Sequence, residues 1–309
     1  MKILITGGTG LIGKEVSRQL LAQGHQVVRL SRNPQKNPEG VPEFFWDLDR
    51  MEAASEAFEG VEGIINLAGA PIAKRWTPSY KSEILRSRAD AIRLLLQEVE
   101  RHQIALQTFV SASAVGYYAD DLEALRQEDD PPGQDFLSLV CQKWEQEAQL
   151  FEALSVRTVI LRIGIVLSGT GGALPQIAAP IRYGLGAPLG SGKQWMPWIH
   201  LQDVAAMFVH ALEKSALQGV YNAVGPANVT NKELTEAVAS VLKKPLWLPP
   251  VPGWALKLGL GEMAQTVLAS NRSSHQKIAQ TGFSYRFTDL KEALEEALLS
   301  REPKPQTSA

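Results

Sequence analysis

The chain has 309 residues, of which 45% are hydrophobic and 21% charged, as expected of a soluble globular protein with a full core. Its formal net charge of -2 gives no excess of Lys and Arg, which argues against general affinity for nucleic acid or anionic lipid and favours a small-molecule partner. The single cysteine, Cys141, excludes an intramolecular disulfide, and no stretch reaches the roughly 18 apolar residues of a membrane span, so we expect a cytoplasmic protein.

Strands and helices alternate through the first 170 residues. The apolar run at residues 2–6 predicts a buried strand, a helix follows over residues 13–23, and residues 25–32 predict the next strand. Further strands are expected before residue 47 and over residues 61–69, 107–115 and 156–167, with helices over 78–102 and 135–151. This order predicts an α/β fold with a Rossmann-like, doubly wound parallel sheet and right-handed crossovers.

The sequence pattern changes after residue 167. Residues 168–198 are rich in Gly and Pro and predict a loop-rich segment over a site. A helix over 200–214 and a strand over 219–224 follow, and a helix over 229–244 is expected to start from a cap at Thr230 or Asn231. We expect a first domain over 1–170, to which 200–222 return, a smaller C-terminal α/β domain over 171–199 and 223–299, and a flexible tail over 300–309.

The segment TGGTGLIG places Gly7, Gly10 and Gly13 between the first strand and the first helix. Missing side chains allow a tight turn and close approach to a pyrophosphate, while the helix start offers free N–H groups to the anion. Glycine triplets also form purely structural turns. Here strand, turn, helix and second strand follow in order, which predicts dinucleotide binding.

The end of the second strand distinguishes between the two nicotinamide cofactors. An acidic residue there would bind a ribose 2'-hydroxyl and favour NAD, but the chain has Ser31 and Arg32. A guanidinium can pair with a 2'-phosphate, so the sequence favours NADP(H); the alternative is that Arg32 is a solvated surface residue. Asp47 follows the third strand and can receive the adenine amino group, or it can be an exposed loop residue.

Beyond these residues, the chain resembles the extended short-chain dehydrogenase/reductase superfamily, in particular its atypical branch of epimerase family proteins. The similarity covers nearly the whole chain and is carried by the segments TGGTGLIG, LSRNP, INLAGAPI, RWTPSYKSEILRSR, SASAVGYY, DFLSLVCQKWE, GSGKQWMPWIHLQDVA, LGEMAQTVLAS and TGFSYRFTDLKEAL. The resemblance implies that the first domain binds NADP(H) and that the second binds the substrate.

The resemblance also implies which residues contact the cofactor. They are Gly7, Gly10, Leu11, Ile12, Gly13, Ser31, Arg32, Leu67, Ala68, Glu83 and Arg88, with Val166 beside the nicotinamide. The residues themselves support part of this set, since Leu67, Ala68 and Gly69 end a buried strand at the carboxyl edge, where open parallel sheets bind ligands. Glu83 and Arg88 are five residues apart, a poor spacing for a helical ion pair, although a simple surface charge pattern is the alternative.

The usual catalytic set of the superfamily is incomplete. Reductases and epimerases of this kind pair a Ser or Thr with Tyr-x-x-x-Lys, in which the tyrosine exchanges a proton with the substrate oxygen. Ser113 and Lys143 occupy the serine and lysine positions, and the resemblance implies that Lys143 also holds the nicotinamide ribose. Leu139 occupies the tyrosine position, and a leucine cannot donate a proton.

Three other residues are candidates for the missing acid. Tyr117 and Tyr118 follow the Ser113 strand toward the site, or they pack as aromatics over the sheet edge. His200 titrates in the useful range, but capping its loop or bonding to Asp203 is the favoured role.

Two hypotheses follow from these residues. The first is an NADP(H)-dependent oxidoreductase or nucleoside-sugar-epimerase-like enzyme on a small molecule, with Lys81 and Arg75 adding positive charge at the mouth of the site for an anionic or carbonyl-bearing substrate. The second is a catalytically silent NADPH-binding regulator, for example one linked to cell division, which Leu139 favours. The resemblance also allows a homodimer through the helices over 78–102 and 135–151.

Overall fold

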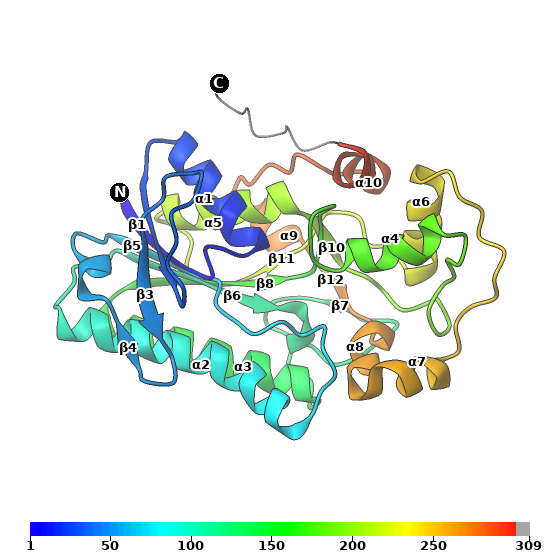
Figure 1. Cartoon of the computed structure of the whole chain (residues 1–309), viewed down its shortest axis with the longest axis horizontal. Helices are drawn as coiled ribbons and strands as arrows, with labels where there is room; N and C mark the ends of the chain where they lie inside the picture. Colours follow the sequence, from blue (N-terminus) through cyan, green and yellow to red (C-terminus); the bar gives the residue numbers. More distant parts are fainter. Residues whose placement is uncertain (301–309) are drawn as a thin grey trace.

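A large, mostly parallel β-sheet forms the centre of the computed structural model, which describes residues 1–300 (Figure 1). Its strand order is β11-β8-β6-β5-β1-β2-β3-β4, and neighbours are parallel except for the β3–β4 pair. The strands of this sheet are β1 (Lys2–Thr6), β2 (Gln26–Ser31), β3 (Glu43–Asp47), β4 (Glu52–Ala53), β5 (Gly63–Asn66), β6 (Thr108–Ala114), β8 (Arg157–Ile163) and β11 (Gly219–Ala223). Two short parallel pairs stand apart: β9 (Ile165–Leu167) with β10 (Trp198–His200), and β7 (Leu125–Arg126) with β12 (Arg272–Ser273).

Helices cover both faces of the sheet. In Figure 1, α1 (Leu11–Ala22) and α5 (Leu201–Glu213) lie above it, and α2 (Pro78–Arg101) and α3 (Phe136–Gln149) lie below it. The remaining α-helices of residues 1–300 are α4 (Leu174–Arg182), α6 (Asn231–Val241), α7 (Gly253–Leu260), α8 (Ala264–Leu268), α9 (Gln276–Ala279) and α10 (Leu290–Leu299), with single-turn helices η1 (Ser55–Phe58), η2 (Val115–Tyr117), η3 (Leu150–Leu154) and η4 (Gly261–Met263). None of the helices in this part of the chain combines the length and apolar character that a membrane crossing requires.

Two hydrophobic cores follow from this arrangement. The larger core joins the sheet to the helices on both of its faces, which explains why β1, β5 and β8 read as nearly continuous apolar runs. The smaller core lies between α4, α6 and α10, around residues such as Trp198, Leu234 and Leu294. The start of α6 is fixed by a capping box, in which the Thr230 side chain accepts from the Glu233 N–H and the Glu233 carboxylate accepts from the Thr230 N–H. Of the two caps that the sequence allowed, Thr230 is therefore the one that forms.

The strand order places the crevice of the sheet between β1 and β5. From β1 the chain proceeds through β2 and β3 in one direction, and from β5 through β6, β8 and β11 in the other. In open α/β sheets, ligands bind where the order reverses, outside the carboxyl ends of the strands. The predicted fold class is therefore confirmed, and the expected binding edge is defined.

One local prediction was wrong. The strand expected over 156–167 is broken at Gly164, where the chain leaves β8 and continues as β9 to pair with β10. The backbone approaches Pro197 closely at this point, since a Cβ on Gly164 would lie 2.4 Å from the Pro197 carbonyl oxygen. The segment predicted to be loop-rich contains one helix, α4, whose Leu174, Ala178 and Ile181 recur at helical spacing on the buried side. The proposed tail lies outside the described residues apart from Ser300.

Candidate cofactor and catalytic site

The glycine turn lies at the switch point of the sheet. Gly7 has a φ of 65°, and a Cβ there would lie 2.6 Å from the carbonyl oxygen of Leu67. A Cβ on Gly13 would lie 2.4 Å from the carbonyl oxygen of Gly7. Both positions therefore require glycine, and the turn packs directly against Leu67 and Ala68 at the end of β5.

The start of α1 is open to an anion. Gly10 occupies the N-cap position, and no side chain accepts a hydrogen bond from the first turn. The unpaired N–H groups and the helix dipole favour a negatively charged group there. Gly172 lies beside both the Leu11 side chain and the Val166 carbonyl, so the fold brings β9 to the same turn.

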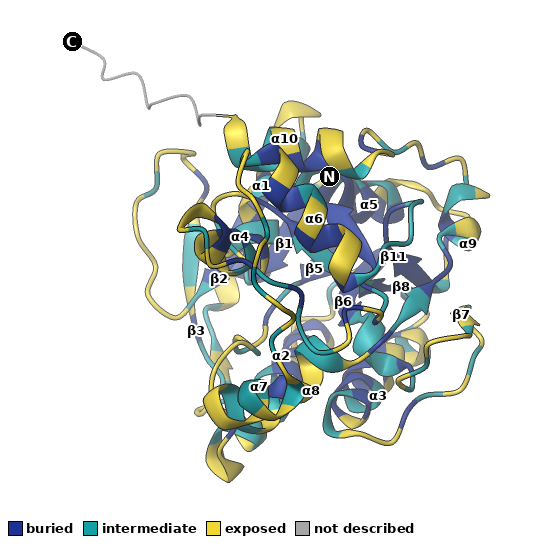
Figure 2. Cartoon of the chain, turned by 90° about the vertical axis from the view of Figure 1, so that its right-hand side faces the viewer, coloured by how far each residue is buried: buried dark blue, intermediate teal, exposed yellow. Residues whose placement is uncertain are grey.

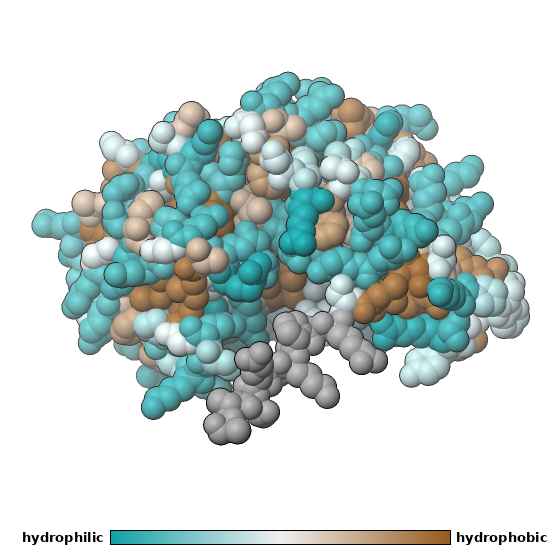
Figure 3. Space-filling model, turned by 90° about the horizontal axis from the view of Figure 1, so that it is seen from above, coloured by the Kyte–Doolittle hydropathy of each residue, from teal (hydrophilic) through white to brown (hydrophobic). Residues whose placement is uncertain are grey.

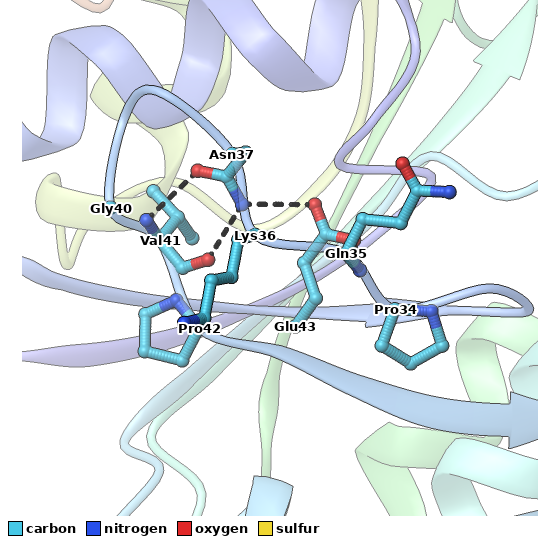
Figure 4. Close-up of a pocket in the computed structure, with 8 residues that line it drawn as sticks. All are labelled: Pro34, Gln35, Lys36, Asn37, Gly40, Val41, Pro42 and Glu43. Atoms are coloured by element: carbon cyan, nitrogen blue, oxygen red, sulfur yellow. Dashed lines mark hydrogen bonds between the residues drawn. The ribbon is translucent and has the colours of Figure 1, made fainter.

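The predicted 2'-phosphate residues lie where β2 ends: Ser31 is its last residue and Arg32 begins the loop to β3. Arg32 is exposed, and the Ser31 hydroxyl accepts from the N–H of Asn33 at 3.3 Å. Asn37 holds this loop in shape: its side-chain amide donates to the Val41 carbonyl (2.8 Å) and to Glu43 (3.1 Å), and its oxygen accepts from the Val41 N–H (3.0 Å) (Figure 4). Residues 34–37 and 40–43 of this loop and of β3 line an open surface hollow of about 490 Å³.

Asp47 is already engaged by its own loop. Its carboxylate accepts from the N–H groups of Asp49 (2.8 Å) and Arg50 (3.2 Å). These two bonds stabilise the turn, so Asp47 would have to bind the adenine amino group in addition to them. The carboxylate is partly exposed and keeps acceptor capacity for such a contact.

Arg88 is a buried cation without a carboxylate partner among residues 1–300. Its guanidinium packs against Gly69, donates to the carbonyls of Ile84 (2.9 Å) and Ala70 (3.2 Å), and lies 4.9 Å from the centre of the Trp144 ring. Burial lowers the pKa of Arg88. An unneutralised guanidinium beside the end of β5 fits a site for an anionic ligand. Glu83, by contrast, is exposed on α2 and makes no ion pair with Arg88.

Ser113 is held by a carboxylate that the sequence analysis did not identify. The Ser113 hydroxyl donates to Glu145 at 2.6 Å, and Glu145 accepts two further bonds from the Arg162 guanidinium, each 2.8 Å long. All three side chains are buried. Burial alone would lower the pKa of Arg162, but the bonds to Glu145 outweigh it and raise that pKa. The serine proton is thus directed into the protein, and the oxygen lone pairs remain to accept a bond.

The two tyrosines after β6 differ in their surroundings. The Tyr118 hydroxyl accepts from Arg162 (2.9 Å) and donates to Asn222 (2.7 Å), and burial raises the pKa of Tyr118 to about 12. The Tyr117 ring lies flat against Arg162, with the guanidinium carbon 3.4 Å from the ring centre. Its hydroxyl has no hydrogen-bond partner among residues 1–300. Tyr118 is therefore a structural residue, whereas Tyr117 keeps a free hydroxyl.

Lys143 and Leu139 lie on the outer part of α3. The Lys143 ammonium is 2.7 Å from Glu147, which also binds Arg93 of α2, and the Lys143 side chain is 41% exposed. Leu139 is 55% exposed. The structure does not bring Lys143 together with Ser113, so its predicted contact with the ribose stays a prediction.

His200 has the structural role that the sequence favoured, with a different partner. Its Nδ1 accepts from the Gln202 N–H at the start of α5, so Nε2 carries the proton and donates to Glu296 at 2.8 Å. Burial lowers the pKa of His200. Of the two structural alternatives, His200 forms the cap and not the bond to Asp203, whose carboxylate accepts from the backbone N–H groups of residues 286 and 287.

The positive charge expected at the mouth of the site is partly neutralised. Lys81 pairs with Glu262 of η4 at 2.6 Å, which ties the start of α2 to the C-terminal part of the chain. Arg75 lies beside Gly261 in the same region. Lys81 therefore connects α2 to η4 by an ion pair, whereas Arg75 has no ion-pair partner among residues 1–300.

One sequence feature indicates that Arg162 has a buried partner. Arg162 interrupts an otherwise apolar run over 159–167, and a charged residue inside a buried strand needs a partner. Glu145 lies four residues after Cys141, on the side of α3 that faces the sheet. The pairing itself became visible only when strand and helix were placed next to each other.

Comparison with known proteins agrees with this architecture. The family model described as "NAD dependent epimerase/dehydratase family" matches residues 3–224, and a domain of unknown function, DUF1731, matches residues 251–297. The epimerase family protein YfhF of Bacillus subtilis is 36% identical over 302 residues, covering 97% of this chain and 99% of that protein.

Two solved structures are also similar. The human epimerase family protein SDR39U1, crystallised with NADPH, superposes with a TM-score of 0.88 at 32% identity, covering 97% of this chain and 100% of the other. A nucleoside-diphosphate sugar epimerase from Corynebacterium glutamicum gives a TM-score of 0.78 at 29% identity, covering 96% of this chain and 58% of the other.

Proposed function

The chain belongs to the NAD-dependent epimerase/dehydratase family, and on that basis we propose that it binds NADP(H) and acts as an oxidoreductase or nucleoside-sugar-epimerase-like enzyme on a small molecule. The observation that carries the proposal is the glycine turn, closed against the end of β5 beside the uncapped start of α1. The NADPH in the human relative's structure supports the choice of cofactor.

The proposed cofactor-binding residues divide by the part of the cofactor that each would hold. Gly7, Gly10 and Gly13 with the start of α1 would bind the pyrophosphate, and Ser31 and Arg32 the 2'-phosphate. The other proposed contacts come from α1, β3, the end of β5, α2 and β9: Leu11, Ile12, Asp47, Leu67, Ala68, Gly69, Glu83, Arg88 and Val166. When bound, the cofactor supplies or accepts a hydride.

Ser113 and Tyr117 would handle the substrate oxygen. Because the Ser113 hydroxyl donates its hydrogen bond to Glu145, its oxygen is left as an acceptor and can orient a substrate hydroxyl. Tyr117 supports a role as the proton-exchanging group, because its hydroxyl is free and a guanidinium lies against its ring face. Tyr117 would thus take the role of the tyrosine that the superfamily has at the position of Leu139.

A matched pair of variants tests this assignment. We expect Tyr117→Phe to lower NADPH turnover with a panel of carbonyl compounds by about 10²–10⁴-fold, with NADPH affinity and unfolding free energy unchanged. Tyr118→Phe should instead lower stability, because Arg162 and Asn222 lose their shared partner. Equal turnover in the wild type and Tyr117→Phe would exclude Tyr117 as the proton-exchanging group.

The second hypothesis, a silent NADPH-binding regulator, is favoured by one observation. The Leu139 and Lys143 positions do not form a catalytic pair, since Lys143 is bound to Glu147. NADPH binding without hydride transfer to any member of the panel would favour this regulator. Transfer of deuterium from labelled NADPH to a product would favour the enzyme.

A further inference from the structure

One end of the molecule exposes an unusual number of large apolar side chains. Figure 2 looks directly at this end, where α7 and the segment that leads into it are largely exposed. The side chains are Tyr183 (83% exposed), Leu185 (60%), Trp247 (68%), Trp254 (72%) and Leu258 (79%). No residue of α7 is buried, although the helix is predominantly apolar. Single exposed apolar residues are ordinary, but a group of this kind indicates an interaction surface.

These side chains come from segments that lie side by side. The Trp247 indole N–H donates to the carbonyl of Gly184 at 2.9 Å, and Gly184 is the residue between Tyr183 and Leu185 in the chain. Further along, the Val251 N–H donates to the Pro188 carbonyl at 2.8 Å, two residues before α7 begins. Trp254 and Leu258 are four residues apart and therefore share one face of α7. Figure 3, which views the molecule from above, shows a hydrophobic area bordered by hydrophilic side chains toward the right-hand end, while α7, at the bottom of Figure 1, lies on the far side of this view.

The charge on the same segments is entirely positive. Residues 168–202 and 237–261 contain no Asp or Glu, although the whole chain has more acidic than basic residues. Arg182, Lys243, Lys244 and Lys257 are exposed there and have no ion-pair partner among residues 1–300. The net charge of -2 thus conceals a local basic region, which the composition alone could not reveal.

We propose that this aromatic–basic face, formed by Tyr183, Leu185, Trp247, Trp254 and Leu258 with Arg182, Lys243, Lys244 and Lys257, docks on an anionic lipid surface. Trp and Tyr are suited to the boundary between headgroups and acyl chains, because their rings are apolar and their polar atoms can remain hydrated. Unpaired Lys and Arg side chains beside them match anionic headgroups. The absence of acidic residues from these two segments favours lipid over a protein surface of mixed charge.

The binding would be peripheral. The apolar contribution comes from a few side chains at the edge of a folded domain, so attachment depends on the basic residues as well and is reversible. Salt should weaken it, since the charges are exposed and screened within about 10 Å at 0.1 M.

Brominated lipids provide a direct test with the full-length protein. Vesicles of equal parts phosphatidylglycerol and phosphatidylcholine, with bromine on the acyl chains, should bind the protein at low salt and quench its tryptophan fluorescence. Among residues 1–300, Trp247 and Trp254 are the tryptophans that are more than two-thirds exposed, so the double variant Trp247→Phe/Trp254→Phe should lose this quenching. Phosphatidylcholine vesicles alone should bind weakly.

A charge-matched pair of variants tests the basic residues. Lys243→Gln/Lys244→Gln should weaken binding about twentyfold or more, at about fivefold for each charge removed. Lys36→Gln/Lys214→Gln removes two exposed lysines elsewhere and should leave binding within about twofold of the wild type.

Three results would overturn the proposal. They are absence of binding to the mixed vesicles at low salt, an equal loss in both lysine pairs, and lipid-free self-association that Trp254→Ser abolishes. The last result would assign the face to a second copy of the chain.

Discussion

Removal of the Glu145 carboxylate should lower the free energy of unfolding far more than removal of a carboxylate whose partners are exposed. Glu145 accepts bonds from Ser113 and from two nitrogens of Arg162, all between 2.6 and 2.8 Å. Glu145→Ala would leave the Arg162 guanidinium buried without its counter-ion. Loss of one partner of such a pair costs about 3–5 kcal/mol, a large part of the roughly 5–15 kcal/mol that stabilises a typical domain.

Glu147 supplies the matched control. It is also buried on α3, but its partners Lys143 and Arg93 are 41% and 43% exposed and can return to water. Glu147→Ala should therefore cost only about 1 kcal/mol. Urea denaturation followed by circular dichroism measures both variants, with the transition midpoint compared at equal slope.

A difference between the two variants of less than about 1 kcal/mol would refute the reasoning, because it would mean that Arg162 is not confined to the protein interior. Glu145→Leu combined with Arg162→Met should recover only part of the stability, because the apolar pair leaves no unpaired charge but Ser113, Tyr118 and the Glu128 carbonyl each lose a hydrogen-bond partner. The same double variant should lose turnover if Ser113 depends on Glu145 for its orientation.

Three further predictions follow from individual contacts. Gly13→Ala should abolish NADPH binding in a fluorescence titration and destabilise the fold by about 1–3 kcal/mol through overpacking, whereas Gly259→Ala, with open space around its Cα, should leave both unchanged or slightly improved. Burial raises the pKa of Cys141 to about 12, so a thiol reagent should label the protein at pH 8 only after unfolding, and rapid labelling of the native protein would contradict this burial. Because burial lowers the pKa of His200 in the folded state, unfolded chains take up a proton at about pH 6.5 that folded chains do not, and stability should fall below that pH by up to about 1.4 kcal/mol per unit. His200→Gln should flatten this dependence in denaturation curves measured from pH 7.5 to 5, and an unchanged slope would exclude His200 as its source.

The sequence predicted the sheet well because local patterns determine it. Buried strands and amphipathic helices alternate with clear turns, and the chain follows the short right-handed connections that such patterns favour. The Thr230 cap and the glycine turn were predictable for the same reason, since the residues that form each of them are neighbours in the chain.

The site was less predictable because its contacts join distant segments. Glu145 and Arg162 are 17 residues apart, and Tyr118 and Asn222 are 104 residues apart, so no local spacing indicates either pair. The resemblance suggested Lys143 from a motif position, but the geometry shows its bond to Glu147 instead. Overall composition likewise hid the basic end of the molecule, because acidic residues elsewhere balance its charge.

Cofactor choice is the central claim, and a titration with NADPH and NADH followed by cofactor fluorescence tests it most directly. The wild type should bind NADPH at least about tenfold more tightly, a difference of roughly 1.4 kcal/mol. Arg32→Ala should remove this preference, and Arg101→Ala, an exposed arginine at the end of α2, should retain it. Equal affinity for the two cofactors, or binding of neither, would contradict the account.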